Sequence, residues 1–255
     1  MSELHSLPYR LVGSEAVVTG GNVGLGGGVT AALLRGGANV TVLSRSEPDP
    51  ALSGIADASG LTLRHIAVNL ADERETEHAL DWLLSKIEID ILVNNAGVQR
   101  RYPAENFPTD EFDAVLDVNL RAVFHVTQRV ARPMLERGRG RVISIASLLS
   151  YQGGLNVAAY AASKGAVAQL TKALSNEWSG RGINVNAVAP GYMQTALNEQ
   201  LIADPVRSRQ ISERIPVGRW GQPDDIAGAV CFLASTAADY VTGIVLPVDG
   251  GWLAR

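Results

Sequence analysis

Three side chains in the second half of the chain form a set that could interconvert an alcohol and a carbonyl. Tyr160 and Lys164 lie four residues apart in a stretch predicted to be helical, so they share one helix face. A nearby ammonium lowers the pKa of a phenol, and Lys164 is therefore predicted to tune Tyr160 into an acid or base near neutrality. Ser147 ends the preceding predicted strand and would hold the reacting oxygen.

A glycine-rich turn near the N-terminus indicates a phosphate-binding site. Glycines 20, 24 and 26 lie between a predicted strand, Glu15–Thr19, and a predicted helix, Gly24–Gly36. Glycine allows a tight turn and a close approach of phosphate to the backbone. The free N–H groups and positive dipole end of the following helix would face that phosphate. The Tyr-xxx-Lys spacing alone is unspecific. Its interpretation as a catalytic pair is supported by the glycine-rich turn, which belongs to the same predicted sheet.

The end of the second predicted strand, Asn39–Ser44, selects the ribose group of a dinucleotide. An acid there would bind the 2′-hydroxyl and repel a 2′-phosphate. The chain instead carries Ser44, Arg45 and Ser46, and a guanidinium suits a phosphate. NADP is therefore predicted as the preferred cofactor, with NAD as the alternative. A solvated Arg45 is the other interpretation, and the nearby Glu47 weighs against the phosphate.

The whole chain alternates predicted strands with predicted helices. This pattern predicts an α/β fold: a single domain over 1–255, with a Rossmann-type doubly wound sheet of seven parallel strands and helices on both faces. Residues 192–219 fall outside the alternation and are predicted to be a short helical substrate lid, or else a surface decoration. The other expected strands and helices are Leu61–Val68, Ala71–Lys86, Ile89–Val93, Thr109–Arg137 capped by Thr109, Arg141–Ile145, Val157–Gly180, Ile183–Ala189, Pro223–Ala234 and Ile244–Val248.

Composition excludes several classes of protein. A net charge of −4 argues against a nucleic-acid partner, and no apolar run reaches the ~18 residues of a membrane span. The N-terminal stretch Met1–Arg10 has no signal-peptide core, so a cytoplasmic location is expected. The single cysteine, Cys231, is expected to be a packing residue. No metal is expected, because the four histidines, His5, His65, His78 and His125, show no ligand spacing.

With these motifs in place, the chain resembles the short-chain dehydrogenase/reductase family along nearly its whole length. The motifs on which this resemblance rests are the turn Thr19–Gly26, the run Asn94–Gly97, Asn119, the set of Ser147, Tyr160 and Lys164, and Pro190-Gly191 with Thr195. The resemblance implies that Asn119 is a fourth catalytic residue, which kinks its helix and holds a water that links the lysine to solvent. Asn69 is a departure, since many members carry an aspartate there. The predicted cofactor contacts are Gly20, Asn22, Gly24, Leu25, Gly26, Ser44, Arg45, Asn69, Leu70, Asn95, Ala96, Gly97, Tyr160, Lys164, Pro190, Gly191, Met193 and Thr195.

Four segments are similar to the sugar-acid branch of that family, the 2-dehydro-3-deoxy-D-gluconate and gluconate 5-dehydrogenases. They are Ser150–Gly154, Ala189–Met193, Arg214–Gly221 and Val248–Arg255. The resemblance implies oxidation of a secondary alcohol at carbon 5 of a six-carbon sugar acid. A guanidinium would bind the carboxylate. The candidate substrate contacts are Arg100, Arg101, Gln152, Tyr192 and Trp220, although arginine pairs are often solvated and these aromatics could simply pack the lid.

Two other functions stay open. A reductase of 3-oxoacyl groups on a carrier protein would share every catalytic residue, and Arg132, Arg137, Arg139 and Arg141 could form its docking surface. A non-catalytic NADP-binding sensor is less favoured, because all four catalytic positions are present. The family resemblance implies a homotetramer. Trp252, an apolar side chain near the end of the chain, is expected at a subunit interface.

Overall fold

The fold is built around one parallel sheet. The computed structural model describes residues 9 and 11–255, which form a seven-stranded sheet of order β3-β2-β1-β4-β5-β6-β7. The expectations for Met1–Arg10 and for His5 therefore fall outside the described residues, Tyr9 excepted. The order reverses direction between β1 and β4, and in such sheets a dinucleotide binds at that crevice. The strands are β1 (Glu15–Thr19), β2 (Asn39–Ser44), β3 (Leu63–Ala67), β4 (Ile91–Asn94), β5 (Gly140–Ile145), β6 (Ile183–Pro190) and β7 (Val245–Val248).

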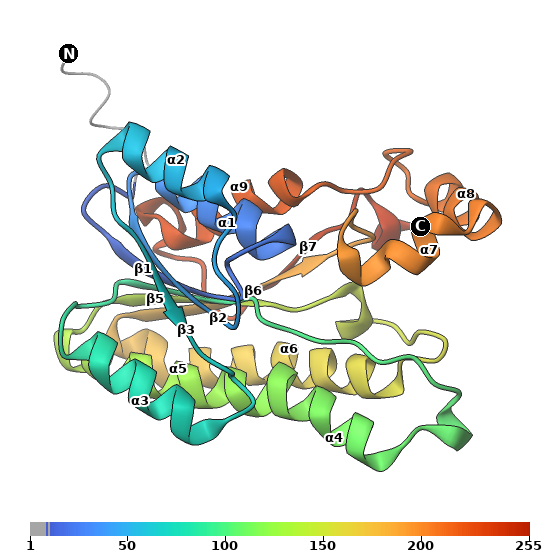
Figure 1. Ribbon diagram of the computed structural model, residues 1–255, viewed down its shortest axis with the longest axis horizontal. Helices are drawn as coiled ribbons and strands as arrows, with labels where there is room; N and C mark the ends of the chain where they lie inside the picture. The colour runs from blue at the N-terminus through green and yellow to red at the C-terminus, as the bar shows by residue number, and fades with distance from the viewer. Residues whose placement is uncertain (1–8, 10) are drawn as a thin grey trace.

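Helices cover both faces of the sheet, as predicted (Figure 1). One layer contains α1 (Gly24–Arg35), α2 (Pro50–Ser59) and α9 (Pro223–Ala234). The other contains α3 (Glu73–Leu84), α4 (Thr109–Leu116), α5 (Ala122–Arg137) and α6 (Ala158–Trp178). Two short helices, α7 (Glu199–Ala203) and α8 (Pro205–Arg214), follow the carboxyl end of β6, within the segment predicted to be a lid.

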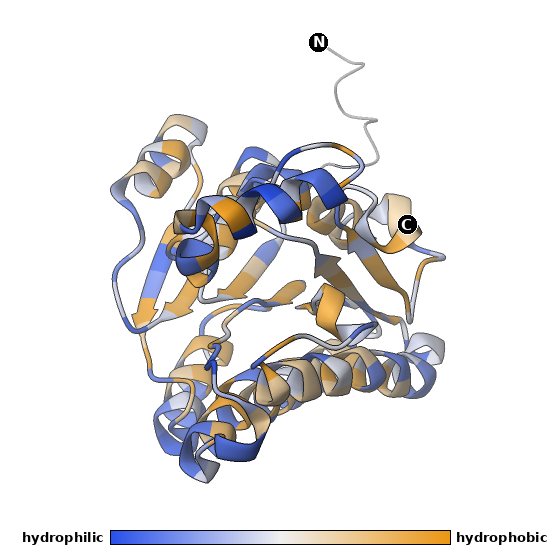
Figure 2. Ribbon diagram, turned by 90° about the vertical axis from the view of Figure 1, so that its right-hand side faces the viewer, coloured by the Kyte–Doolittle hydropathy of each residue, from blue (hydrophilic) through white to orange (hydrophobic). Residues whose placement is uncertain are grey.

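The strands are apolar on both sides because each side packs under a helical layer. Val17 and Val18 are adjacent on β1 and fully buried, yet they belong to different clusters. Val18 packs with Leu33 of α1, whereas Val17 packs with Leu83 of α3. Successive strand side chains point to opposite faces, so a continuous apolar run fills both cores. Figure 2 shows mostly hydrophobic strands between the two layers of amphipathic helices.

Two helices differ from the sequence prediction. Helix α2 was not predicted, although Asp49 caps its first turn by accepting a hydrogen bond from the Ala51 N–H and Pro50 begins it. The single helix expected over Thr109–Arg137 is interrupted by a π-helical turn, Asp117–Arg121. Thr109 is also not a cap: it is the first helical residue, after Pro108, and makes no capping hydrogen bond.

The turn between β1 and α1 depends on contacts that leave no room for a side chain. A Cβ atom at Gly26 would lie 2.0 Å from the Gly20 carbonyl oxygen and 2.4 Å from the Asn95 Nδ2 atom. Asn95 follows β4 and donates from Nδ2 to the carbonyls of Thr19 (3.1 Å) and Gly20 (2.9 Å). Gly20 itself has a φ of +61°, which favours glycine. The turn is therefore fixed to the neighbouring strand.

None of the helices in the described part of the chain has the length and hydropathy of a membrane span.

Gly26→Ala should lower the free energy of unfolding by about 3 kcal/mol or more, because the clashing atoms belong to backbone and to a braced amide. The matched control is Gly54→Ala in α2, where a Cβ meets nothing within 4 Å. That control should raise the stability by about 0.5–1 kcal/mol through helix propensity. Urea denaturation followed by circular dichroism measures both, and equal midpoints for the two variants would contradict this account of the turn.

Candidate active site

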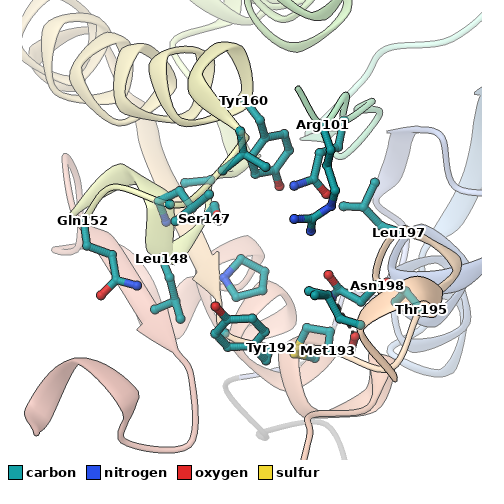
Figure 3. A pocket seen from close by; sticks show the side chains of 18 of the residues that line it. Arg101, Ser147, Leu148, Gln152, Tyr160, Tyr192, Met193, Thr195, Leu197 and Asn198 are labelled. Carbon is teal, nitrogen blue, oxygen red and sulfur yellow. Dashed lines mark hydrogen bonds between the residues drawn. The ribbon is translucent and has the colours of Figure 1, made fainter. Parts of the chain in front are cut away.

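Ser147, Tyr160 and Lys164 meet at the carboxyl edge of the sheet. Ser147 follows β5, while Tyr160 and Lys164 lie on the first turns of α6, one turn apart. Ser147 and Tyr160 line a cavity of about 310 Å³, a size that suits a small molecule. Figure 3 shows the Tyr160 hydroxyl and the Ser147 side chain at one wall of this cavity, with the Arg101 guanidinium pointing into the same space.

Asn119 lies in the π-helical turn and is fully buried. Its Nδ2 donates to the Val98 carbonyl (2.9 Å) and to Ser163 Oγ (3.1 Å), and its Oδ1 accepts from the Val98 N–H at 2.8 Å. The Nζ atom of Lys164 donates to the carbonyl of Ile145 at 2.6 Å. A Cβ placed at Gly97 would lie near both Asn119 Oδ1 and Lys164 Nζ, so the two side chains approach the same glycine.

Burial opposes charge on both the tyrosine and the lysine. It raises the pKa of Tyr160 above its ordinary value, while a hydrogen bond from Ser147 and the charge of Arg101 lower it less strongly. Burial also lowers the pKa of Lys164 to about 8. The prediction that Lys164 brings the pKa of Tyr160 towards neutrality is therefore wrong for this arrangement of residues. The ammonium group points at the Ile145 carbonyl, 5.7 Å from the Tyr160 ring centroid.

A second groove runs along the crevice between β1 and β4, and the predicted cofactor contacts line it. Tyr160 lines both the groove and the cavity, so the two join at this tyrosine. Helix α1 begins at Gly24 with no side-chain cap, which leaves its first N–H groups free for an anion. The groove is lined by Gly20, Asn22, Gly24, Leu25, Gly26, Ser44, Arg45, Asn69, Leu70, Asn95, Ala96, Gly97, Tyr160, Lys164 and Thr195; Pro190, Gly191 and Met193 line the adjoining cavity.

The ribose end of the groove carries an exposed cation. Arg45 makes no ion pair within residues 9 and 11–255. Glu47, which weighed against a phosphate at this position, instead approaches His65, with Oε2 3.0 Å from Nδ1. Ser44 Oγ donates to the Ser46 carbonyl at 2.8 Å, and Asn22 donates to Ser46 Oγ at 2.9 Å. The polar loop is therefore ordered by its own contacts and leaves the guanidinium available.

Three of the five predicted substrate contacts line the cavity: Arg101, Gln152 and Tyr192. The other two do not. Arg100 turns away and pairs with Glu111, with Nε 2.7 Å from Oε2. Trp220 is buried under the lid, where its ring packs edge-on against Tyr192 at 5.4 Å between centroids.

Trp252 is not placed at the surface, contrary to the expectation of a subunit contact. It is 4% exposed and belongs to the same cluster as Trp220, Ile211 and Ile215. Its ring lies 4.6 Å from that of Tyr192, and the Arg214 guanidinium lies 3.9 Å from its centre. The C-terminal segment therefore packs inside the chain, against the base of α8.

Sequence reasoning missed several residues of the cavity wall. Arg207, on α8, and Asn198 come from the segment predicted to be a lid, and Asn156 comes from the loop before α6. Asn156 has a φ of +61° and its carbonyl accepts from the Tyr102 N–H, which ties this loop to the segment carrying Arg101. No spacing along the chain singles these residues out, because they come together only when the chain folds.

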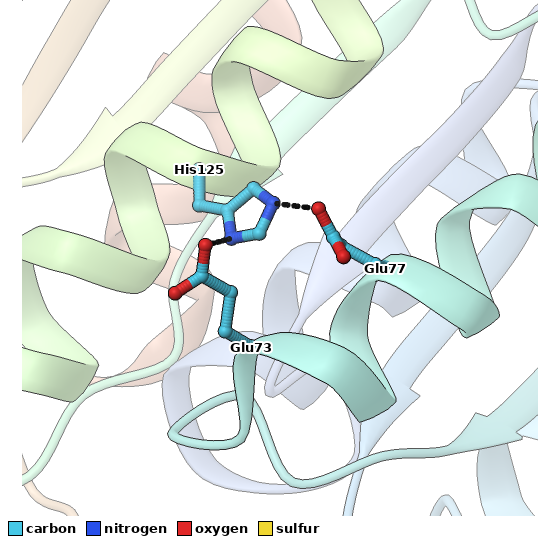
Figure 4. Close-up of side chains that lie close together, drawn as sticks. All are labelled: Glu73, Glu77 and His125. Atoms are coloured by element: carbon cyan, nitrogen blue, oxygen red, sulfur yellow. Dashed lines mark ion pairs between the residues drawn. The ribbon is translucent and has the colours of Figure 1, made fainter.

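One histidine forms a cluster that its sequence position did not indicate. His125 on α5 lies between Glu73 and Glu77 of α3, with Nδ1 3.7 Å from one carboxylate and Nε2 3.6 Å from the other (Figure 4). Three such side chains could hold a metal ion. However, the carboxylates are exposed and pair with different ring nitrogens. Since Arg129 pairs with Asp81 one turn further along the same two helices, we read the cluster as an ion-pair ladder between α3 and α5.

Most of the arginines considered as a carrier-protein docking surface form ion pairs within the chain. Arg137 and Arg139 approach Glu88, and Arg141 pairs with Asp239. Neutralised guanidinium groups are poor partners for a second acidic surface.

Comparison with known proteins places this geometry in a family. A family model described as "Enoyl-(Acyl carrier protein) reductase", which represents short-chain reductases, matches residues 20–253. The chain belongs to the short-chain dehydrogenase/reductase family. The family resemblance inferred from the motifs is thereby confirmed, and so is the doubly wound fold.

Individual members of the short-chain dehydrogenase/reductase family match over the full length. The 2-dehydro-3-deoxy-D-gluconate 5-dehydrogenase of Bacillus subtilis is 45% identical over 255 residues, covering 100% of both chains. The gluconate 5-dehydrogenase of Gluconobacter oxydans is 40% identical, covering 95% of this chain and 96% of that one. The crystal structure of a gluconate 5-dehydrogenase from Burkholderia cenocepacia, in complex with NADP and tartrate, has a TM-score of 0.91 and 40% identity, covering 97% and 98%.

Lys164→Met should remove a pH dependence of stability. The pKa of Lys164 falls from 10.5 to about 8 on folding, so between these values the unfolded state binds more protons and stability rises with pH. The free energy of unfolding of the wild type relative to the variant should therefore increase by about 2 kcal/mol between pH ~8 and ~10. Denaturant titrations of both proteins at the two pH values measure this difference. A difference that stays constant with pH would show that Lys164 keeps an ordinary pKa.

Proposed function

We propose that the protein interconverts a secondary alcohol and a ketone at carbon 5 of a six-carbon sugar acid of the gluconate or 2-dehydro-3-deoxygluconate type. The observation that carries this proposal is the charge of the cavity beside Tyr160. Arg101 and Arg207 line it, and no aspartate or glutamate does so among the described residues. Arg101 makes no ion pair in residues 9 and 11–255, so its guanidinium is free for a carboxylate. The names of the relatives agree with this substrate class.

The proton in this reaction moves at the substrate oxygen. In the reductive direction Tyr160, whose raised pKa keeps it protonated at neutral pH, donates its phenolic proton to the carbonyl oxygen. Ser147 donates a hydrogen bond to the same oxygen and stabilises the charge that develops there. In the oxidative direction the tyrosine takes the hydroxyl proton, which requires its ionised form. A bound nicotinamide supplies or accepts the hydride at the adjacent carbon.

Lys164 and Asn119 restore the proton of Tyr160. A lysine with a pKa near 8 exchanges protons readily near neutrality. Its contact with the Ile145 carbonyl holds it below the tyrosine, and Asn119 lies across Gly97 from it. The π-helical turn turns the Asn119 side chain towards Val98 and Ser163, where its amide is fixed on both sides. These four residues form the proposed catalytic set.

The residues of the groove fit a dinucleotide, and we propose NADP as the preferred cofactor. The uncapped start of α1 and the glycine turn would hold the pyrophosphate. Arg45 would pair with the 2′-phosphate, since Glu47 is turned to His65. Asn69 lines the groove. Its Oδ1 atom accepts a hydrogen bond from the Ala71 N–H at 3.3 Å, which fixes the loop after β3. Asparagine at this position therefore fits the site.

We propose that residues 192–219 act as the substrate lid, within a single catalytic domain. This segment provides Tyr192, Asn198 and Arg207 to the cavity wall. We also propose that the protein assembles as a homotetramer. The family resemblance supports that state, and so do exposed apolar side chains such as Phe124 on α5 and Ile244 before β7.

The first test is turnover of D-gluconate and 2-dehydro-3-deoxy-D-gluconate with NADP, followed at 340 nm. Tyr160→Phe should lower kcat by about 10²- to 10⁴-fold, because it removes the proton carrier. Arg101→Ala should raise the KM of the sugar acid by about 10- to 100-fold, because it removes a charged contact. The matched control is Arg100→Ala, whose side chain pairs with Glu111 outside the cavity and should leave KM within about twofold. Turnover of a 3-oxoacyl thioester alone would disprove the sugar-acid proposal.

The cofactor preference rests on Arg45 and can be tested separately. Arg45→Ala should raise the KM for NADP by about tenfold and leave that for NAD nearly unchanged, since only NADP carries the 2′-phosphate. Steady-state kinetics with each cofactor measures both values. Equal effects on the two cofactors would mean that this guanidinium does not bind the phosphate.

A further inference from the structure

The C-terminal tryptophan makes one hydrogen bond to a residue that lines the proposed substrate site. Trp252 donates from Nε1 to the Gln152 Oε1 atom at 3.3 Å, across 100 residues of sequence. Gln152 lines the cavity beside Tyr160, whereas Trp252 does not. Trp252 therefore contacts Gln152 from the side that faces away from the cavity.

The indole itself is held from several sides. Its ring lies between the ring of Tyr192 and the guanidinium of Arg214, at 4.6 Å and 3.9 Å from the respective centres. The backbone around it is fixed by Asp249, whose carboxylate accepts from the N–H groups of Gly251 (2.8 Å) and Leu253 (2.9 Å). Trp252 is only 4% exposed, so close packing restrains its side chain. Its N–H therefore points in one direction.

The chemistry of the indole decides how the glutamine amide is oriented. An indole N–H can only donate, so the atom of Gln152 that faces it must be the oxygen. The amide nitrogen, with its two N–H groups, then lies on the side of the amide that does not face the indole. Figure 3 shows this arrangement, with the nitrogen of Gln152 on the side of the cavity and its oxygen on the outer side.

We infer that Trp252 is a positioning residue that makes Gln152 a hydrogen-bond donor to the substrate. Without the indole, the amide could turn over and present either its donor or its acceptor side. With it, the site selects a substrate that offers an acceptor oxygen at this point, as a hydroxyl, a carboxylate or a carbonyl does. The inference rests on the proposed sugar-acid function for the identity of the substrate, but the orientation of the amide does not depend on it.

The sharpest test compares two substitutions of similar size at Gln152, one to an apolar side chain and one to a carboxylate. Gln152→Met removes the donor and should raise the KM of the sugar acid by about three- to tenfold with kcat little changed. Gln152→Glu keeps an acceptor for the indole but presents an oxygen to the cavity, so it should raise KM well beyond the methionine variant. A glutamate variant with a KM equal to or below that of the methionine variant would overturn the inference, because a donor would then not be needed.

The tryptophan is tested by Trp252→Phe, which keeps an aromatic ring for Tyr192 and Arg214 but removes the N–H. The KM should rise by about two- to fivefold, with the affinity for NADP unchanged. In the double variant with Gln152→Met, the phenylalanine should add nothing to the methionine effect, because both changes remove one interaction. Trp82→Phe on the exposed face of α3 is the matched control and should behave as wild type. Additive effects, or an unchanged KM in Trp252→Phe, would contradict the positioning role.

A readout independent of activity separates this inference from the proposed function. In protein labelled with ¹⁵N-tryptophan, the indole N–H signal missing from Trp252→Phe belongs to Trp252. That signal should shift upfield in Gln152→Met, because its acceptor is lost. If the wild type turned over no sugar acid while the signal shifted, the proposed function would fail and the amide orientation would stand. An unmoved signal would overturn the orientation whatever the substrate.

Discussion

The contact between Gly20 and Gly26 is the constraint on which the rest of the site depends. Because the Gly20 carbonyl occupies the place that a Cβ atom of residue 26 would take, α1 starts close against the end of β1. Asn95 fixes the same carbonyl from β4, so the turn is held to the neighbouring strand. The free N–H groups of α1 therefore face the crevice where the order of the strands reverses. The close contact between Gly20 and Gly26 therefore shapes the groove proposed for the cofactor. It also shapes the side of the cavity that Tyr160 closes.

Burial shifts the pKa values of the proposed catalytic pair. It raises the pKa of Tyr160 and lowers that of Lys164, so it drives both groups towards their neutral forms. When Tyr160 gives its proton to the substrate oxygen, an ammonium with a lowered pKa can return one to the phenolate, which leaves the phenol and the amine both neutral. The positive charge at this wall comes from Arg101, which approaches the tyrosine from the cavity side. The proposed anion-binding residue, Arg101, and the proposed proton carrier, Tyr160, are thus electrostatically coupled.

The parts of the molecule that could be predicted from sequence are those governed by local rules. Glycines at a strand-to-helix junction, apolar runs and the Tyr160–Lys164 spacing all reflect neighbours in the chain. They indicated the sheet, the glycine-rich groove and the placing of Tyr160 and Lys164 on one helix. Arg207 and Trp252 were misplaced or missed because their partners lie far away in sequence. The pKa of Tyr160 was predicted in the wrong direction for the same reason. Spacing showed a nearby ammonium, whereas burial depends on everything packed around the side chain.

The walls of the cavity are assembled from separate segments of the chain. Arg101 comes from the loop after β4, Gln152 from the loop after β5, and Arg207 from a helix after β6. The residues proposed to carry out the reaction lie elsewhere: Tyr160 and Lys164 are on α6, and Ser147 follows β5. Substitutions in these segments can therefore change what the cavity binds without altering the residues on α6 or after β5. Such modularity lets a gene duplicate acquire a new metabolite by small steps, each of which leaves a working dehydrogenase.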